Sequence, residues 1–385
     1  MKIVDLEVML VGLPTRRAHR WAGLRGPIGR YVVVRLRTDD GLEGWGETPC
    51  LPDWGGAYMR YYGETPGTVR HVLLDLLLPV LRDEDPLAIG RIHAVMDQVI
   101  KGHPYAKAAL DIALHDLKGR ALGVPVYDLL GGRIRQWVPV GHSIGLMDVE
   151  PAVEEALAVV REGIRHIKVK GGPDPDRDLR VVEAVRAAVG EAVELRLDAN
   201  QAYTVPVAIR TLRAMERWHL AFAEQPSEGI DELAAIARAV PTPLMADESA
   251  WTCRDVLHLY TTGAARYVSL YVTKPGGLYR ARQMAAVLEA AGMEADLGGS
   301  AEFGIANAAN LHLGAASPAV TLPAIIPVTT VAGREQTEVA GRIYTDDIVA
   351  EPFEYRQGAL RVPDGPGLGI TIDEDKLRRY RVEWA

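Results

Sequence analysis

The chain has 385 residues and a formal net charge of −8, with 43 Lys and Arg residues against 51 Asp and Glu residues. Hydrophobic residues make up 48% and charged residues 24%, a balance that excludes wholesale disorder and, without a basic stripe, argues against a nucleic-acid partner. Two cysteines, Cys50 and Cys253, cannot build a disulfide framework. We find no signal peptide and no apolar run of about 20 residues, so we expect a cytoplasmic protein without a membrane partner.

The first 65 or so residues are predicted to be rich in β-strands. Residues 1–11 and 31–37 alternate apolar and polar side chains, and a turn signal follows the second of these segments. Residues 14–27 and 48–67 are rich in Gly, Pro, Arg and aromatic residues, which is typical of loops. The strands should therefore carry two long loops.

The pattern becomes helical over residues 68–122, where apolar residues recur at i, i+3 and i+4, and Gly123-Val124-Pro125 ends the run. We therefore predict an α+β domain over residues 1–125. The residues from about 350 to 385 lack any repeating pattern and are expected to complete that domain.

From residue 130 onwards, short β-branched runs alternate with amphipathic helices. The strand candidates are residues 137–143, 166–170, 194–198, 222–224, 244–247, 267–271 and 294–297. This alternation implies a parallel sheet with right-handed crossovers, and seven or eight consecutive repeats favour closure into a barrel. The predicted fold is α/β, with an α+β N-terminal capping domain over a (β/α)7β barrel of TIM type at residues 130–350.

Polar residues close these strands one after another. They are Lys168, Lys170, Asp198, Glu224, Asp247 and Tyr271. Their spacing of one βα unit predicts that they converge on the C-terminal face of the barrel. Three carboxylates so close together would repel each other unless a divalent cation lay between them, and Mg²⁺ prefers such oxygen ligands. Taken singly, each acid is as well explained as a helix cap or a solvated loop residue.

Lys168 and Lys170 are two residues apart, so their side chains should point to the same side of one strand. If that side holds the metal, a lysine there has a lowered pKa and can act as a base near neutral pH. The plainer interpretation is a charged strand end.

Several motifs together resemble the enolase superfamily, and within it the muconate lactonizing enzyme subgroup. They are Lys168-Val169-Lys170, Asp198-Ala199-Asn200, Glu224-Gln225-Pro226, Asp247-Glu248-Ser249 and Gly276-Gly277-Leu278. The resemblance implies a capping domain over a modified barrel, and removal of the proton α to a carboxylate to give a metal-stabilised enediolate. It also implies Mg²⁺, with Mn²⁺ as a substitute, bound by Asp198, Glu224 and Asp247.

The same resemblance assigns roles to individual residues. Lys170 would be the base, Lys168 an electrophilic partner of the substrate carboxylate, and Asn200 and Glu302 would contact the substrate. Relatives of this kind assemble as dimers or octamers, so a homo-oligomer is expected.

One position departs from the family pattern. A second acid/base lysine usually stands five residues before the Gly-Gly pair, and here that residue is Tyr271. We expect Lys170 to be the single base and Tyr271 to be a hydrogen-bond donor or general acid. In the alternative, Tyr271 only packs and Lys274 bends back to replace it.

A single base favours a dehydratase, acting by syn β-elimination, or a cycloisomerase. A racemase or epimerase of an amino-acid derivative or betaine stays open, since Lys170 and Tyr271 could form a two-base pair. In the two N-terminal loops, His19, Trp54 and Tyr58 are candidate substrate ligands. Aromatic rings in these loops would suit a cationic amine ring through cation–π contact, so proline-like carboxylic acids are among the candidate substrates. A non-enzymatic carboxylate-binding barrel would bind its ligand equally well without metal.

Overall fold

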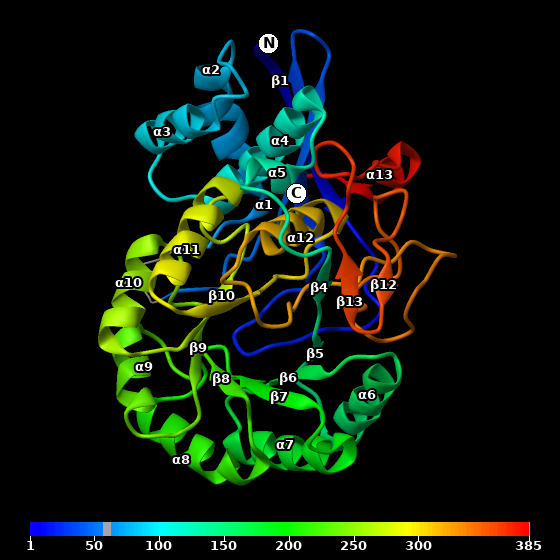
Figure 1. Cartoon of the computed structure of the whole chain (residues 1–385). Coiled ribbons are helices and arrows are strands. Elements are labelled where there is room, and N and C mark those ends of the chain that lie inside the picture. The colour runs from blue at the N-terminus through cyan, green and yellow to red at the C-terminus, as the bar shows by residue number, and fades with distance from the viewer. Residues whose placement is uncertain (57–62, 385) are drawn as a thin grey trace.

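The computed structural model describes residues 1–56 and 63–384. Tyr58 therefore lies outside the described residues. The chain begins with an antiparallel sheet of four strands in the order β14-β1-β2-β3. Its strands are β1 (Ile3–Gly12), β2 (Arg30–Thr38), β3 (Glu43–Thr48) and β14 (Arg381–Val382). Because β14 comes from the end of the chain, the C-terminal residues pack on the N-terminal sheet (Figure 1).

Helices cover this sheet. They are α1 (Pro66–His71), η1 (Val72–Leu77), α2 (Leu78–Leu81), α3 (Ile89–Val99), α4 (Pro104–Leu122) and α5 (Val126–Leu129). Helix α4 lies directly on β3, and a Cβ atom at Gly46 would be only 1.9 Å from the carbonyl oxygen of Ala109. Glycine is therefore required where the two backbones touch. Gly123, at φ 71°, ends α4 in the left-handed region, where the sequence predicted its end.

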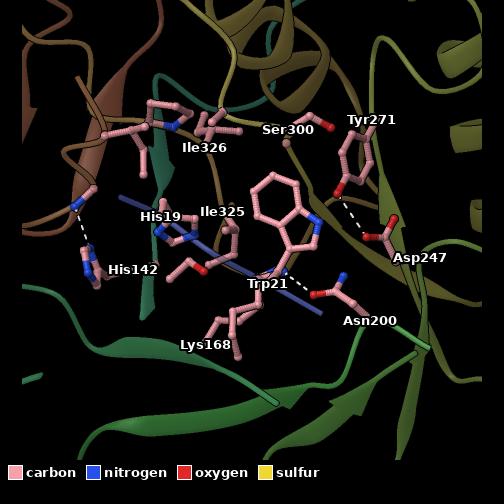
Figure 2. A pocket seen from close by; sticks show the side chains of 18 of the residues that line it. His19, Trp21, His142, Lys168, Asn200, Asp247, Tyr271, Ser300, Ile325 and Ile326 are labelled. Carbon is pink, nitrogen blue, oxygen red and sulfur yellow. Dashed lines mark hydrogen bonds between the residues drawn. The ribbon is translucent and has the colours of Figure 1, made fainter. Parts of the chain in front are cut away.

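The second part is a curled sheet of seven parallel strands in sequential order, surrounded by helices (Figure 1). The strands are β5 (His142–Ile144), β6 (His166–Lys170), β7 (Glu194–Asp198), β8 (Phe222–Glu224), β9 (Leu244–Ala246), β10 (Tyr267–Leu270) and β11 (Glu294–Leu297). The helices are α6 (Val149–Arg161), α7 (Pro175–Val189), α8 (Val205–Met215), η2 (Glu216–Trp218), α9 (Ile230–Ala237), α10 (Cys253–Thr262), α11 (Leu278–Ala290) and α12 (Gly304–Ala316). This is the predicted modified TIM barrel under an α+β domain. Residues at the carboxyl ends of its strands line the cavity in Figure 2.

The first predicted barrel strand, residues 137–143, is wrong as a single strand. The structure divides it into β4 (Trp137–Pro139) and β5. Strand β4 pairs antiparallel with β13 (Ala359–Arg361), which also pairs with β12 (Tyr355–Arg356), whereas β5 pairs parallel with β6. The reason is local: Pro139 has no N–H to donate, and the chain changes partners directly after it.

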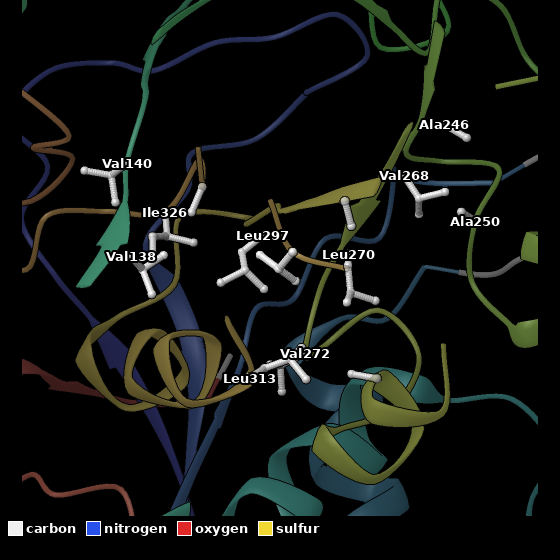
Figure 3. Packing of buried hydrophobic residues seen from close by; sticks show 14 of the residues in the cluster. Val138, Val140, Ala246, Ala250, Val268, Leu270, Val272, Leu297, Leu313 and Ile326 are labelled. Carbon is white, nitrogen blue, oxygen red and sulfur yellow. The ribbon is translucent and has the colours of Figure 1, made fainter. Parts of the chain in front are cut away.

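The core fills the barrel and the space between its strands and helices. Figure 3 shows part of it, where Val268 and Leu270 of β10, Leu297 of β11, Val138 and Ile326 belong to one buried cluster. Such runs of buried apolar residues are typical of parallel strands covered on both faces. After the barrel, α13 (Glu374–Tyr380) leads into β14. The domain limits at residues 125, 130 and 350 stay predictions.

Among the described residues, no helix combines the length and the apolar character that crossing a membrane requires.

Candidate active site

A cavity lies where the barrel strands end beneath the N-terminal loops. Its empty volume is about 640 Å³, counting the open mouth. Lys168, Lys170, Asn200, Asp247 and Tyr271 line it from the barrel side, in the positions at which the sequence predicted polar strand ends. Figure 2 shows several of these side chains directed into a common space.

Strand register brings the first predicted residues together. Lys170 pairs with Asp198 across β6 and β7, and Asp198 pairs with Glu224 across β7 and β8. The Lys168 Nζ atom lies 2.9 Å from Asp198 Oδ2 and 3.0 Å from Glu224 Oε1. Lys170 Nζ donates to Asp198 Oδ2 at 2.6 Å and to Asn200 Oδ1 at 2.8 Å. The two lysines therefore share one carboxylate and point to the same side, as their spacing predicted.

Burial and neighbouring charges shift the pKa values of these groups in opposite directions. Burial alone would raise the pKa of Asp198, but Lys168 and Lys170 hold it below its usual range. Burial, together with the Asp198 carboxylate, raises the pKa of Glu224 to about 7. Burial lowers the pKa of Lys168, yet Asp198 and Glu224 outweigh that effect and raise it overall. Lys168 therefore carries a charge that can hold an anion.

Tyr271 and Lys274, the two candidates for the acid/base position on the sixth strand, both donate hydrogen bonds to Asp247. The Tyr271 hydroxyl donates to Asp247 Oδ2 at 3.0 Å. Lys274 does bend back: its Nζ donates to Asp247 Oδ1, to the Asp247 carbonyl and to the Ser269 carbonyl, each at 2.8 Å. However, Lys274 is 0% exposed and lies 4.5 Å from the centre of the Tyr271 ring, outside the set of residues that line the cavity. Among the described residues, Tyr271 lines the cavity and Lys274 does not.

The donor set fits a divalent cation in its chemistry. Glu248 Oε2 is buried without a hydrogen-bond partner among the described residues, and Glu224 Oε2 accepts no hydrogen bond there but lies 3.4 Å from Arg196 Nε. Acidic groups outnumber basic ones in this buried region: the acids are Asp198, Glu224, Asp247, Glu248, Asp296 and Glu302, and the bases are Lys168, Lys170, Arg196 and Lys274. In residues 1–56 and 63–384, no three acidic, His or Cys side chains are drawn together closely enough to hold a metal. The ammonium group of Lys168 instead bridges two of the acids.

The N-terminal loops supply the opposite wall of the cavity. His19, Trp21 and Trp54 line it, and the Trp54 ring centre lies 5.6 Å from that of Tyr271. Lys170 Nζ lies 5.6 Å from the centre of the Trp21 ring. The predicted candidates His19 and Trp54 are thus at the site.

Glu302 does not line the cavity. It is buried, and its carboxylate accepts a hydrogen bond from the Ser300 backbone N–H at 2.8 Å. Burial raises the pKa of Glu302 to about 7. Ser300 lines the cavity in this region, and the substrate contact proposed for Glu302 stays a prediction.

Sequence reasoning missed the wall formed by His142, Ile325 and Ile326, which Figure 2 shows around His19. His142 begins the first parallel strand, so it would have been found had residues 137–143 been divided correctly. Its Nε2 lies 2.8 Å from Glu155 Oε1, and its Nδ1 accepts from the Gly341 N–H. Ile325 and Ile326 lie outside any regular element and carry no periodic signal.

Two family descriptions match the chain. "Mandelate racemase / muconate lactonizing enzyme, N-terminal domain" matches residues 10–131, and "Enolase C-terminal domain-like" matches residues 151–376. Muconate cycloisomerase 1 of Rhodococcus opacus is 33% identical over 99% of this chain and 98% of that protein. The N-succinyl-L-Arg/Lys racemase of Bacillus cereus is 32% identical over 99% and 98%.

Solved structures of proteins with related sequences are similar to this chain over nearly its whole length. The crystal structure of the Bacillus cereus racemase superposes with a TM-score of 0.88 at 31% identity, covering 100% of this chain and 99% of that one. A dipeptide epimerase from Enterococcus faecalis, in complex with Mg and the dipeptide L-Leu-L-Tyr, gives a TM-score of 0.85 at 28% identity, covering 96% and 100%.

Proposed function

The chain belongs to the mandelate racemase / muconate lactonizing enzyme family of the enolase superfamily, and we propose that it is a Mg²⁺-dependent enzyme with one catalytic base. Lys170 would remove the proton α to the carboxylate of a small acid, and an oxygen substituent on the β-carbon would then leave from the same face. When that oxygen stays tethered to the product, the reaction is a cycloisomerisation. When it leaves as water, the reaction is a dehydration.

Asp198, Glu224 and Asp247 would hold the metal ion in this proposal. When bound, Mg²⁺ supplies positive charge beside the substrate carboxylate, where negative charge builds up as the proton leaves. Lys168 adds a second positive charge to the same carboxylate. Supporting the assignment, Oε2 of Glu248, the residue after Asp247, is buried without a hydrogen-bond partner among the described residues. The Enterococcus faecalis relative also contains Mg.

The proton has a defined path in this scheme. The C–H bond breaks first: its proton moves to Lys170 Nζ, and the electron pair is delocalised into the substrate carboxylate as an enediolate. In a second step the β C–O bond breaks, and that electron pair forms the new double bond. Lys170 then returns the proton to the departing oxygen, so no second base is needed. Asp198 and Asn200, which accept hydrogen bonds from Lys170 Nζ, orient it. The Tyr271 hydroxyl orients the departing group.

The one-base proposal is supported by the position of the lysines that line the cavity. Among the described residues, the lysines that line it are Lys168 and Lys170, both on β6. Across the cavity stands Tyr271, whose hydroxyl donates to Asp247. A phenol with an ordinary pKa of about 10 is a weak base at neutral pH.

Racemisation is the second candidate. It is favoured by the similarity to the Bacillus cereus racemase over nearly the whole chain and by the Tyr271 hydroxyl, which reaches the cavity from the side opposite β6 (Figure 2). In that case Tyr271 would exchange a proton with the second face of the α-carbon.

A screen in D₂O distinguishes the two candidates. The Mg²⁺-loaded protein is incubated with α-protonated acids, including muconolactone, β-hydroxy acids and N-acyl amino acids, and deuterium at the α-carbon is followed by NMR. One-base chemistry predicts exchange from one enantiomer only, accompanied by loss of the β-oxygen. Exchange from both enantiomers with interconversion would establish a racemase instead.

A further inference from the structure

A second cavity lies on the outer side of the first N-terminal loop. Its empty volume is about 920 Å³, and it is formed by residues between Thr15 and Ile28. Three of its lining residues are Arg17, Arg20 and Arg25, and none is acidic. This local excess of positive charge stands out in a chain whose net charge is −8.

Of the residues that the structure describes, only His19 lines both this outer cavity and the active-site cavity. It is 9% exposed, and its Nδ1 is buried without a hydrogen-bond partner among the described residues. Its ring centre lies 6.1 Å from that of Trp21, and its other neighbours include Lys170. The imidazole of His19 is therefore the partition between the arginine-lined space and the catalytic lysine.

The arginines differ in how far they are neutralised. Arg17 is held by Glu155, with its Nε 2.9 Å from Glu155 Oε2, and Asp53 accepts a hydrogen bond from the backbone N–H of Arg25. In the part of the chain that the structure describes, the side chains of Arg20 and Arg25 form no ion pair, and Arg20 is exposed. Their charge is available to a diffusing anion.

We propose that the outer cavity is the entrance through which a carboxylate substrate reaches the active site, with Arg20 and Arg25 attracting it and His19 as the gate. This inference rests on the proposed carboxylate chemistry. A negatively charged protein repels carboxylates at long range, and a cleft lined by positive charge counters this by raising the association rate 10- to 10³-fold in a salt-dependent way.

The experiment measures association directly. The Mg²⁺-loaded protein is mixed with benzoate in a stopped-flow instrument, and the change in tryptophan fluorescence, to which Trp21 and Trp54 in the wall of the active-site cavity contribute, reports binding. We expect Arg20→Gln/Arg25→Gln to lower the association rate constant about tenfold at 20 mM NaCl and to remove the decrease in this rate constant that added salt causes in wild type. The control Arg82→Gln/Arg238→Gln changes net charge equally at two exposed arginines elsewhere and should leave the rate within twofold.

A steric variant tests the route itself. Ala18→Leu narrows the outer cavity, whose wall includes Ala18, without adding a tryptophan, so it should slow association and dissociation of benzoate by similar factors and leave Kd unchanged. Rates unaffected by Ala18→Leu and by the arginine substitutions would overturn the proposed entrance. Absence of any benzoate binding at saturating Mg²⁺ would instead count against the carboxylate site on which the entrance depends.

Discussion

Replacing Tyr271 by Phe separates the two steps of the proposed reaction. The substitution removes one hydroxyl, which donates at 3.0 Å to Asp247. A hydrogen bond to a charged group contributes about 1.5–3 kcal/mol. Because Lys274 keeps its own bond to Asp247 Oδ1 at 2.8 Å, we expect the loss in unfolding free energy to be near the lower limit, about 1.5 kcal/mol.

The effect on catalysis should be larger for the second step than for the first. Proton removal by Lys170 does not involve the Tyr271 hydroxyl, so α-deuterium exchange should stay within about tenfold of wild type. Departure of the β-oxygen loses its orienting group, and product formation should fall about 10²-fold, the lower end for a positioned acid/base group. That factor corresponds to about 2.7 kcal/mol in the barrier.

Both rates are measured in one NMR experiment in D₂O at saturating Mg²⁺. Tyr203→Phe is a matched control, because Tyr203 is equally buried and donates to Asp178, and it does not line the cavity. It should lower stability without changing either rate. If Tyr271→Phe reduced exchange by the same factor as product formation, Tyr271 would act in proton removal, and the one-base reasoning would be refuted.

Three further outcomes follow from buried charges. Arg196 is fully buried, bonds Asp296 at 2.7 Å and lies 3.4 Å from Glu224 Oε2, so Arg196→Met alone should cost about 3–5 kcal/mol in urea unfolding because it leaves both carboxylates without this partner, whereas Asp296→Leu should cost less because Arg196 keeps Glu224. EDTA should abolish α-deuterium exchange and lower Tm, and added Mg²⁺ or Mn²⁺ should restore both. A Tm that does not change when Mg²⁺ is added would argue against the proposed metal site. Burial raises the pKa of Asp347 to about 7, so the folded state retains a proton that the unfolded state releases above about pH 4. Stability should therefore fall between pH 4 and 7 in wild type but less in Asp347→Asn; equal pH profiles in chemical unfolding would contradict this.

The barrel and much of the site could be predicted because both depend on spacing along the chain. One βα unit separates Lys170, Asp198 and Glu224 in sequence, and parallel pairing turns equal spacing into direct neighbours. Side-chain alternation also placed Lys168 and Lys170 on one side. Both rules depend only on spacing along the chain, so they predict side-chain positions without knowledge of tertiary contacts.

The remaining features depend on contacts that sequence spacing does not encode. Pro139 changes the pairing partner within one apparent strand, which concealed His142. Lys274 reaches Asp247 from a turn beyond the strand, so strand parity gave no information about it. Glu302 accepts a hydrogen bond from the Ser300 backbone N–H, a local contact that the spacing of the strands does not encode. The outer cavity is lined by residues of one long loop that carries no periodic pattern.

The most direct test of the account is α-deuterium exchange by the Lys170→Met variant in D₂O, loaded with Mg²⁺ and compared with wild type on both enantiomers of a reactive acid. Methionine has nearly the same length as lysine but no amine, so the proton acceptor disappears while the cavity stays filled. The account predicts that wild type exchanges one enantiomer and that Lys170→Met exchanges neither, with a loss of at least about 10²-fold. Persistent exchange in the variant, or loss from one of two reactive enantiomers, would contradict a single base at Lys170.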